Sequence, residues 1–262
     1  MKSISACNAT PAALKSSPRL LHVIPDPRNP SSDDADASAA SPLALFGGTF
    51  DPVHFGHLRV ARDTAAALRL PEVRLIPAQQ NVLRDRPGAS AADRLAMLQL
   101  AVSDARDAPG LSVDDCELRR TTPSYTIATL EHFRATYPLR PLVWLIGVDA
   151  FLRIQSWHRA KELFDFAHFV VLNRPGFATA NVFSAAMSDV WQGRLANSRA
   201  QLRETLAGSI YLHTVAPQAV SSTEIRALLQ RNPNDQALAA LLPGPVLAYI
   251  RAHRLYAAPR AA

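Results

Sequence analysis

Short apolar runs recur along the chain from residue 43 onward, separated by longer stretches with a different spacing of apolar positions. Each run is only four to seven residues long and is bounded by Gly, Pro or polar residues, which is typical of buried strands. We expect strands at Leu43–Phe46, Val73–Pro77, Leu142–Val148 and Phe169–Leu172, and a more alternating strand nearer a sheet edge at Ile210–Val215.

The stretches between these runs place apolar residues every three or four positions, which is the period of an amphipathic helix. We expect helices over Leu58–Leu70, Ala91–Ala105, Thr126–Tyr137 and Ala160–Phe166, and a helical segment between Thr179 and Ala207. Strands that alternate with helices predict βαβ units. The predicted fold is therefore α/β: a Rossmann-like, doubly wound, mostly parallel sheet with helices on both faces and a helical C-terminal region.

Residues 1–41 have a different composition, rich in Ser, Ala, Pro and Asp. Such a segment cannot bury enough apolar surface to fold alone, so we expect a disordered N-terminal extension. Residues 42–262 carry all the predicted elements and are expected to form one catalytic domain.

The composition narrows the classes of protein. The chain has 262 residues, of which 48% are hydrophobic, two cysteines and a formal net charge of +6. It contains neither an apolar run long enough to span a bilayer nor a secretory signal, so we expect a cytoplasmic protein without membrane contact. The positive charge suits a polyanionic ligand such as a nucleotide. The arginines are scattered, which disfavours a nucleic-acid-binding protein.

The stretch "LALFGGTFDPVHFGHLRVA" begins at the first predicted strand and ends in a predicted helix. Gly47 and Gly48 allow a sharp turn and a close approach to a ligand. A helix that begins near Gly56 would point its first amides at a phosphate. His54 and His57 are three residues apart, so both can face that position and donate to phosphate oxygens. The alternative is that the histidines only cap the helix; the combined features favour a phosphate site.

A second helix start follows the last predicted strand, in "VSSTEIR". Ser221 and Glu224 have the spacing of a capping box, with Ser221 as N-cap. Arg226 lies one turn inside this helix, where its guanidinium can face a phosphate. The two interpretations are compatible, because the cap builds the helix end that binds the anion.

The stretch "IGVDAFLRIQSW" offers two further candidates. Asp149 follows a strand and is suited either to accept ribose hydroxyls or to cap a helix, and the residues alone do not separate these roles. Trp157 is suited to stack on a ligand ring or to fill the core.

"GGTFDPVHFGH" resembles the GTFDPxHxGH signature of the nucleotidyltransferase superfamily, whose H-x-G-H is related to the HIGH motif of class I aminoacyl-tRNA synthetases. Within that superfamily the chain is most similar to the bacterial nicotinate-nucleotide adenylyltransferases, from about Leu43 to Tyr256. The resemblance implies a nucleotidyltransferase domain that transfers AMP from ATP to nicotinate mononucleotide, giving deamido-NAD and pyrophosphate for NAD biosynthesis. "VSSTEIR" resembles the ISSTxIR motif of the same family.

The resemblance also assigns residues. It implies catalytic roles for His54, His57 and Arg226. It implies an ATP site of Gly47, Gly48, Thr49, Phe50, His54, His57, Gly147, Asp149, Ser221, Ser222, Thr223 and Arg226. "PSYTIATL" and the pair Asp149 and Trp157 are similar to the SYT and LGxD…W patterns. They imply that the nicotinate nucleotide is bound by Arg84, Tyr125, Thr126, Ile127, Trp157 and His158.

One position departs from the family pattern. Leu83 stands where the loop after the second strand usually has a histidine, and Arg84 and Arg86 follow it. This substitution leaves open a catalytically impaired nucleotide-binding protein. A second alternative is another enzyme of the superfamily, using nicotinamide mononucleotide, phosphopantetheine or a cytidylyl donor.

The chemistry implied by the family needs positioning and charge compensation rather than a general base, because the attacking phosphate is already ionised. We expect Mg²⁺ to bind through the ATP phosphates and water, without a metal site made of protein side chains. The expected partners are ATP and nicotinate mononucleotide, not nucleic acid or a membrane. Whether the chain forms a homo-oligomer is left open.

Overall fold

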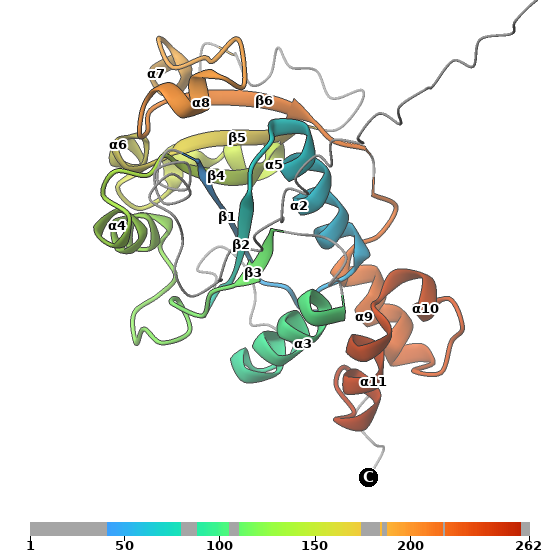
Figure 1. Ribbon diagram of the computed structural model, residues 1–262. Helices are drawn as coiled ribbons and strands as arrows, with labels where there is room; N and C mark the ends of the chain where they lie inside the picture. Colours follow the sequence, from blue (N-terminus) through green and yellow to red (C-terminus); the bar gives the residue numbers. More distant parts are fainter. Residues whose placement is uncertain are drawn as a thin grey trace, which may run out of the picture.

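The computed structural model describes residues 41–79, 88–104, 110–173, 184, 188–216 and 218–257. These residues form one twisted sheet with helices on both of its faces (Figure 1). All but the last residue of the predicted extension, 1–41, lies outside the described part. The predicted fold class, a Rossmann-like α/β sheet, is confirmed.

The described strands form a six-stranded sheet in the order β3-β2-β1-β4-β5-β6, and every neighbouring pair is parallel. The five predicted strands are present, and Ile210–Thr214 lies at a sheet edge as expected. A sixth, Leu111–Val113, was not predicted because its three residues are too few to show a period. The bounds are β1 Leu43–Gly48, β2 Glu72–Pro77, β3 Leu111–Val113, β4 Leu142–Gly147, β5 His168–Asn173 and β6 Ile210–Thr214.

The strand order reverses between β1 and β4. From β1 the chain continues outward through β2 to β3, and then returns to place β4 on the other side of β1. In open parallel sheets, ligands bind beyond the carboxyl ends of the strands at such a switch point. The segments after β1 and β4 are the ones in which the sequence places the histidines and Asp149.

Four longer helices accompany the strands, together with shorter ones. The long predicted helices are confirmed to within three residues at each end. The bounds are α2 Phe55–Leu68, α3 Ala91–Asp104, α4 Thr126–Thr136, α5 Val148–Phe151, α6 Leu163–Phe166, α7 Ser188–Trp191, α8 Gln201–Glu204, α9 Ser222–Arg231, α10 Leu238–Leu241 and α11 Gly244–Ala252.

Two helix predictions need correction. The expected helix Ala160–Phe166 is a 3₁₀ turn, Ala160–Glu162, followed by the single α-turn α6; another 3₁₀ turn spans Ile154–Ser156. The described part of the expected segment 179–207 contains only the one-turn helices α7 and α8, separated by turns. Here apolar residues occur at helical spacing, but Gly193 has a positive φ of 74°, which favours a turn.

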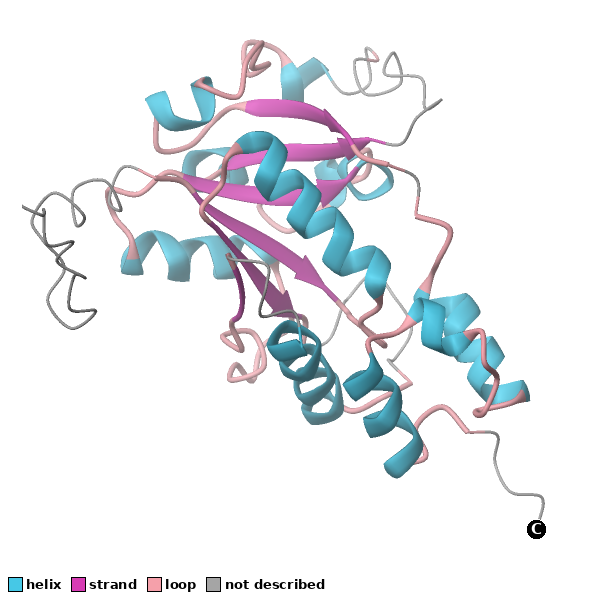
Figure 2. Cartoon of the chain, turned by 45° about the vertical axis from the view of Figure 1, so that its right-hand side comes forward, coloured by secondary structure: helices cyan, strands magenta, loops and turns pink. Residues whose placement is uncertain are grey.

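The sheet separates two hydrophobic cores, because alternate side chains of a strand point to opposite faces. In β4, Val143 and Leu145 belong to one core, whereas Leu142, Trp144 and Ile146 belong to the other. The first core is covered by α2 and α3 and includes side chains of α9 to α11, which lie beyond the strand ends (Figure 1). The second core is covered by α4, α5 and α6. Figure 2 shows helices on both sides of the sheet. Burial on both faces explains why the strands are continuous apolar runs.

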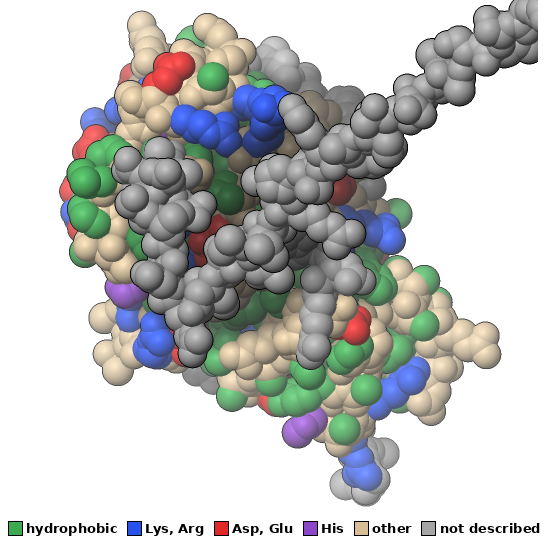
Figure 3. Space-filling model, viewed as in Figure 1, with side chains coloured by type: hydrophobic (Ala, Val, Ile, Leu, Met, Phe, Trp, Pro, Cys, Tyr) green, Lys and Arg blue, Asp and Glu red, His purple; other side chains and the backbone are tan. Residues whose placement is uncertain are grey.

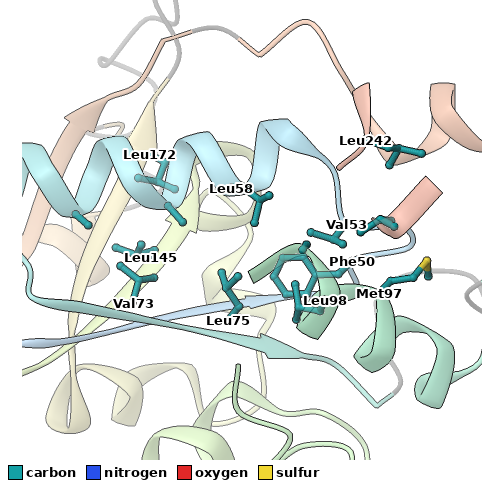
Figure 4. Close-up of a cluster of buried hydrophobic side chains, with 14 of the residues drawn as sticks. Phe50, Val53, Leu58, Val73, Leu75, Met97, Leu98, Leu145, Leu172 and Leu242 are labelled. Atoms are coloured by element: carbon teal, nitrogen blue, oxygen red, sulfur yellow. The ribbon is translucent and has the colours of Figure 1, made fainter. Parts of the chain in front are cut away.

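The first core extends beyond the strand ends into the region of the candidate site. Phe50 and Val53 come from the segment after β1 and lie beside Met97 and Leu98 of α3, with Leu242 nearby (Figure 4). Phe50 and Val53 are each at most 2% exposed. The segment that follows β1 is therefore anchored by apolar packing rather than being a free surface loop.

At the amino ends of the strands, opposite the switch point, one arginine joins several chain segments. The Arg134 guanidinium of α4 donates to the carbonyl oxygens of Tyr137, Pro138 and Arg140 over 2.8–3.3 Å. It also donates to the carbonyl oxygens of Phe166 and Leu206 over 2.7 and 2.9 Å. Three separate segments are thus joined at the amino ends of the strands, far along the sheet from the switch point.

Candidate active site

The segment between β1 and α2 turns later than the sequence predicted. Gly47 and Gly48 do not form the turn: they are the last two residues of β1 and pair in register with Ile76 and Pro77 of β2. The chain turns at Phe50, whose φ is 50°, and at the cis peptide bond between Asp51 and Pro52.

The two glycines are needed for close packing instead. A β-carbon on Gly47 would lie 2.7 Å from ring atoms of Trp144, and one on Gly48 would lie 2.9 Å from the ring of Phe50. Gly56 is equally constrained, since its β-carbon would lie 2.8 Å from Val220 Cγ1 and 2.9 Å from His54 Nδ1. The glycine of H-x-G-H therefore lets the segment before α9 approach the start of α2.

His54 and His57 face the same way, as their spacing predicted. Their rings stack with centroids 3.8 Å apart and planes inclined by 29°, and Phe50 contacts His57 edge-on at 5.1 Å. His54 occupies the N-cap position of α2, but its side chain makes no capping hydrogen bond. The alternative in which the histidines serve only as caps is therefore wrong for the His54 side chain.

Burial decides the charge of His54. This side chain is 5% exposed, and burial lowers its pKa from 6.5 to about 4, although the nearby Glu224 carboxylate acts to raise it. At neutral pH His54 is thus an uncharged imidazole that can donate one hydrogen bond. Its Nδ1 is buried and has no hydrogen-bond partner among the described residues. Helix α2 adds partial positive charge at the same place.

Helix α9 begins beside this histidine pair. Ser221 caps it, and the full capping box with Glu224 is present, as predicted. The Ser222 hydroxyl donates to the carbonyl oxygen of Pro52 over 3.0 Å. This hydrogen bond joins the N-terminus of α9 to the segment that leads into α2. Both helices have ten residues or more, and the N-termini of such helices attract anions.

Arg226 is held against the segment after β1. Its guanidinium donates to the carbonyl oxygen of Asp51 over 2.7 Å and to Thr223 Oγ1 over 3.3 Å, and lies 3.7 Å from the Asp51 carboxylate. The side chain is about one third exposed. It faces a cavity of about 350 Å³ whose lining includes Asp51, Gln230, Arg254 and Tyr256. This places a cation beside open space on the C-terminal side of the segment after β1.

Sequence reasoning missed two residues that organise this region. Asp51 is 4% exposed and accepts four hydrogen bonds, from the amides of Gly88 and Ala89, the Tyr256 hydroxyl and the Arg226 guanidinium. Arg94 of α3 is 1% exposed and donates to the carbonyl oxygens of Thr49 and Gln79 over 2.8 and 3.2 Å. Burial lowers the pKa of Arg94, whereas the Asp51 charge opposes that shift. Arg94 was detectable: with Met97, Leu98 and Ala101 it has the spacing of the buried helix face.

Arg94 and Gln79 connect the histidine segment to the residues expected on the acceptor side. The backbone N–H of Gln79 donates to Ser124 Oγ over 2.8 Å. Tyr125 follows as the N-cap of α4, which begins at Thr126 as expected, and its ring lies 4.5 Å from that of His158. Ile127 is 1% exposed, so its side chain belongs to the core. Arg84, Leu83 and Arg86 lie outside the described residues.

Trp157 lies next to His158 in both sequence and space. Its side chain packs partly against the second core, so part of the core-filling interpretation holds. Its Nε1 is buried without a hydrogen-bond partner among the described residues, as are Thr49 Oγ1 and Gln79 Oε1. Buried polar atoms are rarely left unpaired, so each of these atoms is available to a ligand.

The end of β4 supplies the remaining candidates. Gly147 is the N-cap of the short helix α5, so of the two interpretations of Asp149 the one as helix cap is wrong. Gly147, the last residue of β4, and Asp149, two residues later, are both exposed. A β-carbon on Gly147 would meet nothing within 4 Å, which leaves this strand end open on the ligand side of the sheet.

The charges elsewhere are dispersed. Lys and Arg side chains form several separate groups on the face seen in Figure 3, among hydrophobic and acidic ones. In the part of the chain that the structure describes, no helix is long and apolar enough to cross a membrane. In that same part, no group of three or more His, Cys, Asp or Glu side chains is arranged to hold a metal ion.

The fold and the placement of the motifs define the class: a Rossmann-like, doubly wound α/β protein whose histidines, glycines and Arg226 gather at the switch point. The cytidylyltransferase-like family matches residues 45–228. A protein of Dechloromonas aromatica named "Probable nicotinate-nucleotide adenylyltransferase" is 42% identical over 83% of this chain and 98% of its own length. One of the same name from Laribacter hongkongensis is 44% identical over 82% and 94%. The chain therefore belongs to the cytidylyltransferase-like family and, within it, to the nicotinate-nucleotide adenylyltransferases.

Solved structures agree with the fold. The Plasmodium falciparum nicotinic acid mononucleotide adenylyltransferase complexed with NaAD matches with a TM-score of 0.61, over 82% of this chain and 97% of that one, at 17% identity. The same protein complexed with APC matches with a TM-score of 0.58 at 16% identity. At such low identity the likeness bears on the architecture.

Proposed function

We propose that this chain transfers the adenylyl group of ATP to nicotinate mononucleotide, releasing pyrophosphate and forming deamido-NAD. One observation carries the proposal beyond family membership: the stacked His54 and His57 lie at the N-terminus of α2, which is bonded to the N-terminus of α9. The two helix N-termini, the neutral His54 and the Arg226 guanidinium supply donors and positive charge there, which suits a triphosphate, while the Asp51 carboxylate is already hydrogen-bonded within the protein.

The proposed reaction is a displacement at the α-phosphorus of ATP. A phosphate oxygen of nicotinate mononucleotide forms the new bond to this phosphorus, and the bond to the oxygen that bridges to the β-phosphorus breaks. The electron pair of that broken bond leaves with pyrophosphate. Negative charge therefore increases on the leaving side, and its compensation is the main task of the protein.

Three side chains are proposed to share this task. His54, neutral because of its lowered pKa of about 4, would donate a hydrogen bond to a phosphate oxygen. His57, stacked on it, would act on the same group. Arg226 would bind the β- and γ-phosphates through the N–H groups that do not contact Asp51 or Thr223. Gly147 and Asp149 are proposed to contact the adenosine, at the neighbouring strand end.

Mg²⁺ is proposed to bind through the phosphates of ATP and water. The donor chemistry of the site fits this arrangement. Asp51, the buried carboxylate within the segment after β1, already accepts hydrogen bonds from two backbone amides and a tyrosine hydroxyl. When bound, the ion would add positive charge at the phosphates. The protein side chains would contribute orientation and donors.

The nicotinate nucleotide is proposed to bind on the side of Tyr125, Thr126, Trp157 and His158. Tyr125 and His158 form an aromatic pair, and the first amides of α4 are suited to a carboxylate. The buried Nε1 of Trp157 supplies a donor that the described residues do not use. The network through Gln79 and Arg94 connects this side to Thr49.

An acceptor panel tests the proposal. The purified chain is mixed with ATP, Mg²⁺ and, in separate reactions, nicotinate mononucleotide, nicotinamide mononucleotide or phosphopantetheine, and pyrophosphate release is measured. We expect the highest kcat/KM with nicotinate mononucleotide. Faster release with another acceptor would contradict the proposed substrate, and ATP binding without turnover of any acceptor would contradict the proposed activity.

A further inference from the structure

Tyr256 follows the last helix, α11, and points back into the molecule. The turn after α11 contains two residues in the left-handed region, Arg254 with φ 51° and Tyr256 with φ 62°. This conformation is uncommon for residues other than glycine and persists where surrounding contacts fix it. The Tyr256 side chain is 8% exposed and belongs to the first core. The segment after α11 is therefore folded onto the domain at this residue.

The buried contact that Tyr256 makes is polar. Its hydroxyl donates to Asp51 Oδ1 over 2.7 Å, across a sequence separation of 205 residues. The same carboxylate accepts the amide of Ala89 over 3.1 Å and, at Oδ2, the amide of Gly88 over 2.7 Å. Burial and the Asp51 charge raise the pKa of Tyr256, so its hydroxyl stays protonated and remains a donor.

Asp51 transmits this contact to the candidate active site. Arg226 bonds the Asp51 carbonyl oxygen and lies 3.7 Å from its carboxylate. A β-carbon on Gly88 would lie 3.1 Å from the Tyr256 ring and 3.5 Å from Arg226 Cδ, so Gly88 fits closely between them. Tyr256, Asp51 and Arg226 also line one cavity. A shift of the tyrosine hydroxyl would therefore change the surroundings of the arginine that faces the open space.

We propose that Tyr256 is a positioning residue for adenylyl transfer: by donating to Asp51 it fixes the turn before α2 and the orientation of Arg226. This inference rests on the proposed function, because it concerns the same site. Tyr256 does not need to touch ATP for this role. Its contribution is the geometry of two groups, the Asp51 carboxylate and the Arg226 guanidinium, that are set before the substrates bind.

The test compares Tyr256→Phe with Tyr249→Phe. Each variant removes the hydroxyl of a tyrosine in the C-terminal region that donates to an aspartate far away in the sequence. The Tyr249 hydroxyl donates to Asp93 over 3.0 Å. Asp93 lies on α3, where its carboxylate also accepts a hydrogen bond from the Ser90 hydroxyl over 2.6 Å rather than supporting the turn after β1, which makes Tyr249→Phe the matched control. Measurements are kcat, KM for ATP, KM for nicotinate mononucleotide and, without acceptor, the Kd for ATP.

For Tyr256→Phe we expect kcat/KM for ATP to fall about tenfold and the Kd for ATP to rise, because misplaced groups lose transition-state contacts. KM for nicotinate mononucleotide should change less than about twofold, on the same reasoning. Tyr249→Phe should keep all four constants. Equal constants in the two variants would overturn the inference, as would a Tyr256→Phe protein that is only less stable.

Two additions keep the test decisive. If Tyr256→Phe does not fold, Tyr256→Met, which also lacks the donor but fills the buried space with a flexible side chain, replaces it, and an unchanged Kd for ATP then overturns the inference. If the unaltered chain binds ATP but gives no product with nicotinate mononucleotide, the proposed function fails while the Kd comparison still decides the role of Tyr256. If the unaltered chain does not bind ATP, both proposals are overturned.

Discussion

Arg226 of helix α9 donates a hydrogen bond to the backbone carbonyl oxygen of Asp51, over 2.7 Å and across 175 residues of sequence. This bond joins the two motifs that the sequence shows as separate stretches. The guanidinium has five N–H donors, and the contacts with Asp51 and Thr223 leave further donors to face the cavity. The arginine is thus oriented by the protein before any anion arrives.

Replacing Arg226 by lysine should separate its charge from its geometry. Lysine keeps the positive charge but cannot bond both Asp51 and a phosphate in a fixed plane. We expect kcat to fall about 100-fold, the order found when one preorganised donor to a transition state is lost. Steady-state kinetics with varied ATP provide the measurement. Arg231→Lys, at the exposed end of the same helix, is the control, and an equally small effect in both variants would argue against the role of Arg226.

His57→Ala should lower kcat much more than it weakens the binding of nicotinate mononucleotide. The reason is that His57 is proposed to act on the triphosphate and on charge that develops during the reaction. Steady-state kinetics and the Kd for nicotinate mononucleotide measure the two effects. A variant with normal kcat and a greatly raised Kd for this nucleotide would assign His57 to the acceptor side instead.

The stability of the protein should fall between pH 7 and pH 5, partly because of His54. Its pKa is 6.5 as a model value and about 4 in the folded chain. As the pH falls below 6.5 the unfolded chain takes up a proton that the folded chain refuses, so unfolding becomes easier. The difference amounts to about 2 kcal/mol at pH 5, at 1.36 kcal/mol per pKa unit.

His54→Gln tests this assignment. Glutamine does not titrate, so the variant should lose about 2 kcal/mol less than the unaltered chain between the two pH values, on the same linkage. Urea unfolding at pH 7 and pH 5 gives the four free energies. Burial also lowers the pKa of His168, which contributes equally to both chains and cancels in the comparison. Identical pH dependence in the two proteins would show that His54 is not the titrating group.

Gly47→Ala should destabilise the fold at the β1–β4 junction. The added β-carbon would lie 2.7 Å from the Trp144 ring, and the buried indole cannot move without disturbing the second core. We expect a loss of about 1–3 kcal/mol, as for other overpacked sites. Gly147→Ala is the matched control at the neighbouring strand end, because nothing lies within 4 Å of its β-carbon. Chemical denaturation measures both, and similar losses would refute the packing explanation.

Arg134→Ala should destabilise the chain without changing its kinetic constants. The substitution removes the donor for five carbonyl oxygens near the amino ends of the strands, opposite the switch point. We expect a loss of about 2–3 kcal/mol, since hydrogen bonds to a charged group are among the stronger ones. Arg119→Ala, which breaks an exposed ion pair with Asp115, should cost no more than about 1 kcal/mol. Thermal unfolding and KM for ATP test the two statements.

The strands and the long helices were predictable because burial imposes a period on the sequence. Five of the six described strands and the helices α2, α3, α4 and α9 follow from apolar spacing or a capping pattern. The strand Leu111–Val113 escaped because three residues carry no period. The segment around α7 and α8 was assigned as helix because spacing alone does not reveal that turns interrupt it.

The candidate site was only partly predictable. His54, His57, Ser221 and Arg226 were found because they belong to local motifs with a physical reason for their spacing. Asp51 and Tyr256 act through contacts between distant segments, which a single sequence does not reveal, whereas the buried position of Arg94 could have been read from its spacing on α3. The role of Gly47 was assigned wrongly for the same reason: its neighbour Trp144 lies on another strand, and only the register of β1 against β4 brings them together.

The contacts of Asp51 with Tyr256 and Arg226 also set an order for the making of the protein. A ribosome completes the H-x-G-H turn early and adds Tyr256 some 205 residues after Asp51. Until then the buried carboxylate lacks one of its donors. The H-x-G-H turn is therefore completed only once Tyr256 has been added, so a chain that stops before Tyr256 would be released with its first motif incompletely supported.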